Sequence, residues 1–212
     1  VTLEVEEFAE AGNPKNVLAV MDRFASERRF LMNVGVEKGV VLRQAVSKHG
    51  ARRALELGAY CGYSAVLLGA ELRKCGGTLV SLEADANNAA MARRVVRHAG
   101  LDAVVDIRTS PAAEGIGKLR GQFDLVFIDH WKDDYLSDLK RIEDAGLLSD
   151  GAIVIADNVG IFSDTLCEYL EYVRSSPNYE SRHYALPMEY NDAIPDGIEV
   201  SIWKPSAISA TA

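Results

Sequence analysis

The sequence predicts an α/β fold, in which a mostly parallel sheet of seven strands has helices on both faces and an antiparallel pair of strands at one edge. Two observations predict this fold. Short apolar runs alternate with amphipathic segments from about residue 50 onward, and the last two runs follow one another without a helix between them. No repeat, low-complexity run or linker interrupts the 212 residues, so we expect a single domain over residues 1–212.

Extra helices precede the first strand. Asn13 and Pro14 are typical of a helix start, because a capping side chain is followed by proline at the first helical position. Val17 and Met21 then lie on one apolar face. A second helix is expected over about Glu37–His49, with its end at Gly50.

Strands and helices alternate from there, and strands joined through helices run parallel. Strands are predicted near residues 53–57, 78–83, 103–108, 123–128 and 152–156. Helices are predicted near residues 63–74, 86–99, 133–145 and 163–175. Two further strands, near residues 179–186 and 198–203, are separated by a turn around residues 192–197 and form the antiparallel edge pair.

Composition narrows the class of protein. A net charge of −8 without a basic run argues against nucleic acid as a partner. No apolar stretch reaches the roughly 20 residues that span a bilayer. The scattered Cys61, Cys75 and Cys167 fit a reducing compartment. We therefore expect a cytoplasmic monomer or weak homodimer without a membrane partner, although a chain that starts at Val1 can have lost an upstream targeting or anchor segment.

Polar residues follow two of the apolar strands. The 123–128 strand runs into Asp129, with Lys132 three residues later, and the 152–156 strand runs into Asp157 and Asn158. Carboxyl ends of parallel strands meet at one sheet edge, where ligands bind, and neighbouring strands lie about 4.8 Å apart. Two carboxylates and an amide oxygen at that separation can share one hard cation. The alternatives are a helix cap for Asp129 and a simple turn for Asp157-Asn158, but the combination favours a metal site.

A glycine-bearing turn follows the first strand. Gly58 and Gly62 permit close backbone approach, and the helix after them offers free N–H groups to an anion. Their GxxxG spacing differs from the GxGxxG of pyrophosphate binding, which disfavours NAD. Glu83 ends the second strand, 25 residues beyond Gly58, where an acid can bond ribose hydroxyls. An adenosyl ligand without phosphates is indicated, and S-adenosylmethionine fits, although a tight turn and a surface glutamate remain the alternatives.

These residues resemble the catechol O-methyltransferase family, a group of class I enzymes with a Rossmann-like methyltransferase domain. The resemblance covers nearly the whole chain in order, and its DHWKD and ADNV motifs are more specific than the glycine loop. The motifs that carry it are residues 32–35 (MNVG), 56–66 (ELGAYCGYSAV), 129–133 (DHWKD), 156–159 (ADNV), 189–190 (EY) and 196–197 (DG).

The resemblance implies a role for each site residue. Mg²⁺ would be held by Asp129, Asp157 and Asn158, with Lys132 as general base and Glu189 bonded to one acceptor hydroxyl. The cofactor S-adenosylmethionine would be contacted by Met32, Val34, Glu56, Gly58, Tyr60, Ser64, Glu83, Asp129, His130 and Trp131. The acceptor would be contacted by Phe30, Met32, Asp129, Trp131, Lys132, Asn158 and Glu189.

Two departures from the family pattern stand out. Phe30 occupies the position of a tryptophan in the mammalian enzymes, so a wider acceptor slot is expected. Ala112-Ala113 replaces a Ser-Gln pair that bonds adenine, which removes those side-chain bonds.

The expected function is transfer of a methyl group from S-adenosylmethionine to one hydroxyl of a catechol chelated to Mg²⁺. A phenol with a pKa near 10 is mostly protonated at pH 7, and a bound cation lowers that pKa. One alternative is a related enzyme for bulkier polyphenols or acyl-CoA-linked catechols, of which the second would require a basic patch. Another is a catalytically silent cofactor-binding module, which the retention of Lys132 and the metal ligands argues against.

Overall fold

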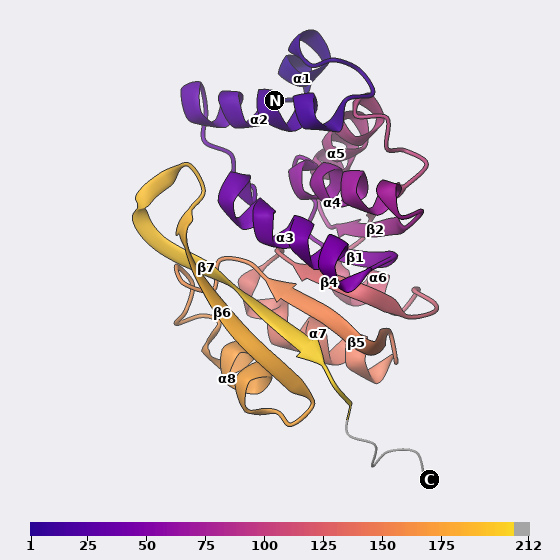
Figure 1. Cartoon of the computed structure of the whole chain (residues 1–212), viewed down its shortest axis with the longest axis vertical. Helices are drawn as coiled ribbons and strands as arrows, with labels where there is room; N and C mark the ends of the chain where they lie inside the picture. Colours follow the sequence, from indigo (N-terminus) through magenta and orange to yellow (C-terminus); the bar gives the residue numbers. More distant parts are fainter. Residues whose placement is uncertain (206–212) are drawn as a thin grey trace.

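The computed structural model describes residues 1–205 and has the predicted α/β fold (Figure 1). Its seven strands lie in the order β3-β2-β1-β4-β5-β7-β6, with β1 to β5 parallel and β7 antiparallel to both of its neighbours. Residues 206–212, the end of the expected domain, lie outside the described residues. The strands are β1 Arg53–Leu57, β2 Thr78–Glu83, β3 Val105–Thr109, β4 Phe123–Ile128, β5 Leu148–Ala156, β6 Tyr179–Met188 and β7 Asn191–Trp203.

The predicted helices are present, and two short ones were not predicted. Asn13 caps α2 as expected, accepting a hydrogen bond from the Asn16 N–H, and Gly50 ends α3 in the left-handed conformation. Helices α1 and α6 are too short to give a clear helical period in the sequence. The helices are α1 Thr2–Phe8, α2 Pro14–Glu27, α3 Gly35–His49, α4 Tyr63–Lys74, α5 Ala86–His98, α6 Ala112–Ile116, α7 Tyr135–Asp144, which follows a 3₁₀ turn at Lys132–Asp134, and α8 Cys167–Ser175.

Two apolar clusters cover the two faces of the sheet. Helices α3, α4 and α5 pack on one face, with α1 and α2 over them, while α6, α7 and α8 pack on the other (Figure 1). Alternate residues of β4 point to opposite clusters, with Leu125 and Phe127 in the first and Val126 and Ile128 in the second. Burial on both faces explains why β4 from Leu125 onward and the end of β5 are continuously apolar.

The predicted turn at residues 192–197 is wrong. The hairpin turns at Glu189-Tyr190, and β7 already begins at Asn191, which pairs with Met188. The first part of β7 pairs with β6, and β5 joins it from Glu199 onward. Pro195 is tolerated inside the strand because, among residues 1–205, β6 is the one strand that pairs with β7 at this position.

The order of the strands locates the ligand-binding edge. β1 and β4 are parallel neighbours at the centre of the sheet, with β2 and β3 on the β1 side and β5 on the β4 side. In such sheets the crevice lies outside the carboxyl ends of these two strands. Within residues 1–205, none of the helices combines the length and the apolar character that a membrane crossing requires.

Candidate active site

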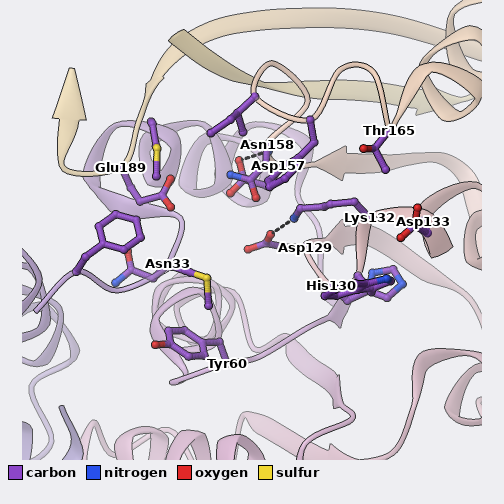
Figure 2. A pocket seen from close by; sticks show the side chains of 16 residues that line it. Asn33, Tyr60, Asp129, His130, Lys132, Asp133, Asp157, Asn158, Thr165 and Glu189 are labelled. Carbon is purple, nitrogen blue, oxygen red and sulfur yellow. Dashed lines mark hydrogen bonds and ion pairs between the residues drawn. The ribbon is translucent and has the colours of Figure 1, made fainter. Parts of the chain in front are cut away.

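A cavity of about 550 Å³ lies at the carboxyl edge of β1, β4 and β5 (Figure 2). Five chain segments meet there: the loop before α3, the glycine loop, the residues after β4, the residues after β5 and the turn of the β6–β7 hairpin. The residues that line it are Phe30, Met32, Asn33, Tyr60, Asp129, His130, Trp131, Lys132, Asp133, Asp157, Asn158, Ile161, Phe162, Thr165, Met188 and Glu189.

Asp129 and Asp157 lie side by side, as the sequence predicted. Each directly follows one member of the register pair Ile128–Ala156, so the two acids leave neighbouring strands at the same level. Burial and the negative charge of Asp129 raise the pKa of Asp157, and the Lys38 ammonium opposes this effect. Asn158 has a φ of 59°, a conformation that asparagine tolerates, and its N–H donates to Asp157 Oδ1 at 2.7 Å.

Lys132 lies on the same edge, close to the first acid. Its Nζ donates to Asp129 Oδ1 at 2.9 Å (Figure 2). It also donates to the Tyr135 hydroxyl at 2.7 Å. The Tyr135 hydroxyl in turn donates to the Asp157 carbonyl at 3.3 Å. Tyr135 therefore links the lysine to the second strand end. Tyr135 has no predicted role, because an aromatic residue in an amphipathic helix is most simply a core residue.

Lys38 is a second lysine at the site, and it has a buried side chain only 1% exposed. Its Nζ contacts Asp157 Oδ1 at 2.9 Å, Glu189 Oε2 at 3.2 Å and Asp196 Oδ2 at 2.6 Å. The one available signal was its position on α3, since Leu42, four residues later, is buried on the same face. Glu189, the predicted acceptor contact, is thus held by a residue without a predicted role.

The charges of this cluster fit a divalent cation. Asp129, Asp157, Glu189 and Asp196 contribute four negative charges when ionised, and Lys38 and Lys132 contribute two positive ones, which leaves a net charge of −2. The donors are the hard oxygens that Mg²⁺ prefers. In the described part of the chain, no group of three or more His, Cys, Asp or Glu side chains is arranged as a metal site. The predicted set, with two carboxylates and one amide, stays a prediction.

The glycines of the loop serve contacts between chain segments. Gly58 has a φ of 96°, and a Cβ there would lie 2.6 Å from the carbonyl oxygen of Asp129. Gly62 has a φ of 88°, and its Cβ would lie 3.0 Å from the Cα of Ala92. Both positions therefore need glycine: Gly58 lets the loop lie directly against the end of β4, and Gly62 lets it lie against α5.

Glu83 shapes the same loop from the end of β2. Its Oε2 accepts the N–H groups of Ala59 and Tyr60 at 3.0 and 2.8 Å, and its Oε1 accepts that of Asp85 at 2.9 Å. A carboxylate has about four acceptor sites, so one remains on Oε1. The predicted bond to a ribose hydroxyl is compatible with this arrangement and stays a prediction.

Glu56 is a buried carboxylate beneath the loop. The Ser81 hydroxyl donates to its Oε2, while Oε1 makes no hydrogen bond of ordinary geometry to the described residues. Burial raises the pKa of Glu56 to about 7, and the interaction with the Ser64 hydroxyl opposes this shift. A buried oxygen without a partner is a position where a ligand donor group would fit.

The predicted contacts divide into two groups. All seven predicted acceptor contacts line the cavity. Of the predicted cofactor contacts, Met32, Tyr60, Asp129, His130 and Trp131 line it, whereas Val34, Glu56, Gly58, Ser64 and Glu83 do not. The lining residues without a predicted role are Asn33, Asp133, Ile161, Phe162, Thr165 and Met188.

Known proteins resemble this chain both in sequence and in structure. Residues 10–171 match the sequence pattern of the O-methyltransferase family. Catechol O-methyltransferase B of Danio rerio is 40% identical over 94% of this chain and 76% of its own length, and catechol O-methyltransferase of Mus musculus is 36% identical over the same shares. The O-methyltransferase of Bacillus cereus, solved in complex with SAH, has the same fold, with a TM-score of 0.75, 23% identity and coverage of 95% and 91% of the two chains.

Proposed function

The chain belongs to the O-methyltransferase family, with catechol O-methyltransferases among its relatives, and we propose that it transfers the methyl group of S-adenosylmethionine to one hydroxyl of a catechol in the presence of Mg²⁺. The main support for the proposal is that one cavity is lined by all four of Asp129, Asp157, Asn158 and Lys132. Acids at two strand ends, an amide and a lysine form a combination suited to activating an acceptor hydroxyl.

Asp129, Asp157 and Asn158 would hold the metal. When bound, Mg²⁺ supplies Lewis-acid stabilisation of negative charge on a phenolic oxygen. Because the Nδ2 of Asn158 donates to Asp196 at 3.1 Å, its Oδ1 is the atom left to act as a ligand. The two positive charges of a bound Mg²⁺ would then balance the net charge of −2 of the cluster.

Lys132 Nζ, as the neutral amine, would receive the proton of the hydroxyl that is methylated and become the ammonium. It lies beside Asp129 and on the cavity wall, so an acceptor near Asp129 is within its reach. Glu189 would accept a hydrogen bond from the neighbouring hydroxyl. Together the two residues would orient a vicinal diol, which is the alignment that a methyl transfer in a single step needs.

Apolar side chains would enclose the acceptor ring. Phe30, Ile161, Phe162 and Met188 line the cavity together with the charged cluster. Walls of this kind keep water away from the reacting hydroxyl and strengthen electrostatic interactions. Glu56, Gly58, Ser64 and Glu83 would support the cofactor from the glycine loop, and Met32, Tyr60, His130 and Trp131 from the cavity side.

A catechol linked to coenzyme A is less well supported. Phosphates of that carrier require basic side chains, and Lys132 is the one lysine or arginine among the lining residues of this cavity. We further propose a cytoplasmic location, because Cys61, Cys75 and Cys167 are unpaired as in a reducing compartment. We also propose that the protein is a monomer or weak homodimer. Light scattering at rising protein concentration tests the oligomeric state.

An acceptor panel tests the proposed reaction. Catechol, resorcinol and hydroquinone are incubated with S-adenosylmethionine and Mg²⁺, and methylated products are measured by mass spectrometry. Only catechol places two hydroxyls on adjacent carbons, so we expect monomethylated catechol and little product from its isomers. Equal methylation of all three would contradict the proposed selection of a vicinal diol.

A further inference from the structure

Lys38 and Asp196 are paired at 2.6 Å behind the metal and acceptor side of the cavity, and neither lines it. Lys38 comes from α3 and Asp196 from β7, and they are separated by 158 positions in the sequence. Both side chains are buried. A buried ion pair is weak evidence for stability by itself, because its desolvation penalty offsets much of the attraction. The contacts of the pair with other residues therefore indicate its role better than its effect on stability does.

Asp196 determines how the Asn158 amide faces. Its Oδ2 accepts from Asn158 Nδ2 at 3.1 Å, and its Oδ1 accepts the N–H groups of Gly160 and Ile161 at 3.0 Å each. Asp196 is an acceptor only, so Asn158 must offer it the NH₂ end. The amide oxygen is then turned away from Asp196 and is available as a ligand.

Lys38 fixes two carboxylates that line the same cavity. Besides Asp196, it holds Asp157 at 2.9 Å and Glu189 at 3.2 Å, with three ion pairs for three ammonium hydrogens. Lys38 therefore sets the separation between one proposed metal ligand, Asp157, and one proposed acceptor contact, Glu189.

We propose that the Lys38–Asp196 pair is a positioning unit that orients Asp157, Asn158 and Glu189 for the metal and the acceptor. This role rests on the proposed function, because it presupposes the metal centre. Groups that hold the ligands of a metal typically change metal affinity by about 10–100-fold when they are removed. The residues that the pair holds are metal and acceptor contacts, so its loss should act on the metal and leave cofactor binding unaffected.

Asp196→Asn gives the sharpest change. The N–H groups of Gly160 and Ile161 still need a side-chain oxygen at this position, so the NH₂ group that the substitution introduces would face both Asn158 and the Lys38 ammonium, which share the other oxygen of Asp196. Two NH₂ groups cannot bond one another, and Asn158 would turn its oxygen toward the substituted side chain and its NH₂ toward the metal position. The variant keeps the size of the side chain at position 196. At the metal position it exchanges the amide oxygen of Asn158 for the NH₂ group.

The matched control is Glu199→Gln. Glu199 is a buried acid three positions further along β7; it pairs with Arg174 at 2.7 Å and does not line the cavity. Its loss tests whether removing any buried carboxylate from this strand disturbs the site. Lys38→Met is the second test variant. Lys38→Met leaves three buried carboxylates without their cation, so the folded fraction of this variant is checked by circular dichroism. If Lys38→Met does not fold, the test uses Asp196→Asn alone.

Mn²⁺ binding is measured without cofactor or acceptor, from the loss of the electron paramagnetic resonance signal of free Mn²⁺, and S-adenosylmethionine binding is measured by calorimetry. We expect Asp196→Asn to weaken Mn²⁺ binding by about 10–100-fold, with cofactor affinity unchanged and Glu199→Gln like wild type. Equal Mn²⁺ affinity in Asp196→Asn and wild type would overturn the positioning role. A parallel loss of cofactor affinity would also overturn it, because it would indicate general disruption. A wild type that binds no Mn²⁺ would overturn the metal centre itself and this role with it.

Discussion

Lys132 and Asp129 are joined at 2.9 Å, from Nζ to Oδ1, although they belong to different structural elements: Asp129 directly follows β4, and Lys132 opens the 3₁₀ turn that leads into α7. The Tyr135 hydroxyl bonds the same Nζ at 2.7 Å. The proposed base is therefore held in place by a proposed metal ligand and by a buried tyrosine. A substitution of Lys132 therefore removes the proposed base and leaves the residues of the glycine loop unchanged.

Lys132→Met should lower kcat by about 10²–10⁴-fold, the usual contribution of a positioned base, with cofactor affinity nearly intact. Methionine keeps most of the length of the side chain and cannot take a proton. Steady-state kinetics with catechol measures the loss, and calorimetry measures cofactor binding. The loss should shrink for nitrocatechols, whose more acidic hydroxyls ionise without help.

Lys140→Met is the control for that substitution. Lys140 is an exposed lysine of α7 that lies over the Tyr172 ring and does not line the cavity. It should keep wild-type kcat. A Lys132→Met enzyme with wild-type kcat on catechol would eliminate the role of Lys132 as base.

Glu83→Ala should weaken S-adenosylmethionine binding by about 1.5–3 kcal/mol, the size of a lost charge-assisted hydrogen bond. Two causes act together: the proposed ribose contact is lost, and the N–H groups of Ala59 and Tyr60 lose their acceptor. Calorimetry gives the affinity, with Glu114→Ala, an exposed acid of α6, as the control. Unchanged affinity in Glu83→Ala would count against both causes.

Phe30→Trp should favour small flat catechols over bulky ones. Phe30 lines the cavity, is 44% exposed and meets the Tyr190 ring edge-on at 6.4 Å. A larger ring at this position narrows the acceptor slot from one side. The ratio of kcat/KM for catechol and for a catechol with a bulky substituent measures the effect. Equal changes for both acceptors would show that Phe30 does not shape the slot.

Glu56 predicts how the stability of the cofactor-free protein depends on pH. Burial raises the pKa of Glu56 from an ordinary value of 4.5 to about 7. The folded state then binds this proton more tightly than the unfolded state, so the contribution to the free energy of unfolding falls as pH rises from about 4.5 to about 7. Glu56→Gln has no such proton. Urea unfolding at about pH 5 and about pH 7.5 should show a larger loss of stability for wild type than for Glu56→Gln, and equal losses would contradict the buried, raised-pKa carboxylate.

Much of the fold and part of the site follow from local sequence patterns. The ends of β4 and β5 could be predicted because continuous apolar runs stop at acids, and α3 because Gly50 ends it. Juxtaposition of Asp129 and Asp157 then followed from the rule that parallel strands share an edge.

Other features depend on contacts between distant parts of the chain. Lys38 has a role only because folding brings Asp196 to it across 158 positions. The early start of β7 depends on pairing with β6, which overrides the turn signals of Asp192 and Pro195. Glu83 was predicted as a ligand contact, and its bonds to the glycine loop could not be foreseen from one sequence because they need the geometry of that loop.

The dependence of methyl transfer on the metal tests the account most directly. Wild-type protein is treated with EDTA, supplied with catechol and methyl-labelled S-adenosylmethionine, and assayed for labelled monomethyl catechol while Mg²⁺ is added in steps. The protein should form no product before metal is restored, and activity should return saturably as Mg²⁺ rises. Full activity in excess EDTA would contradict the metal-dependent mechanism, and absence of methylated catechol at every Mg²⁺ concentration would contradict the proposed reaction.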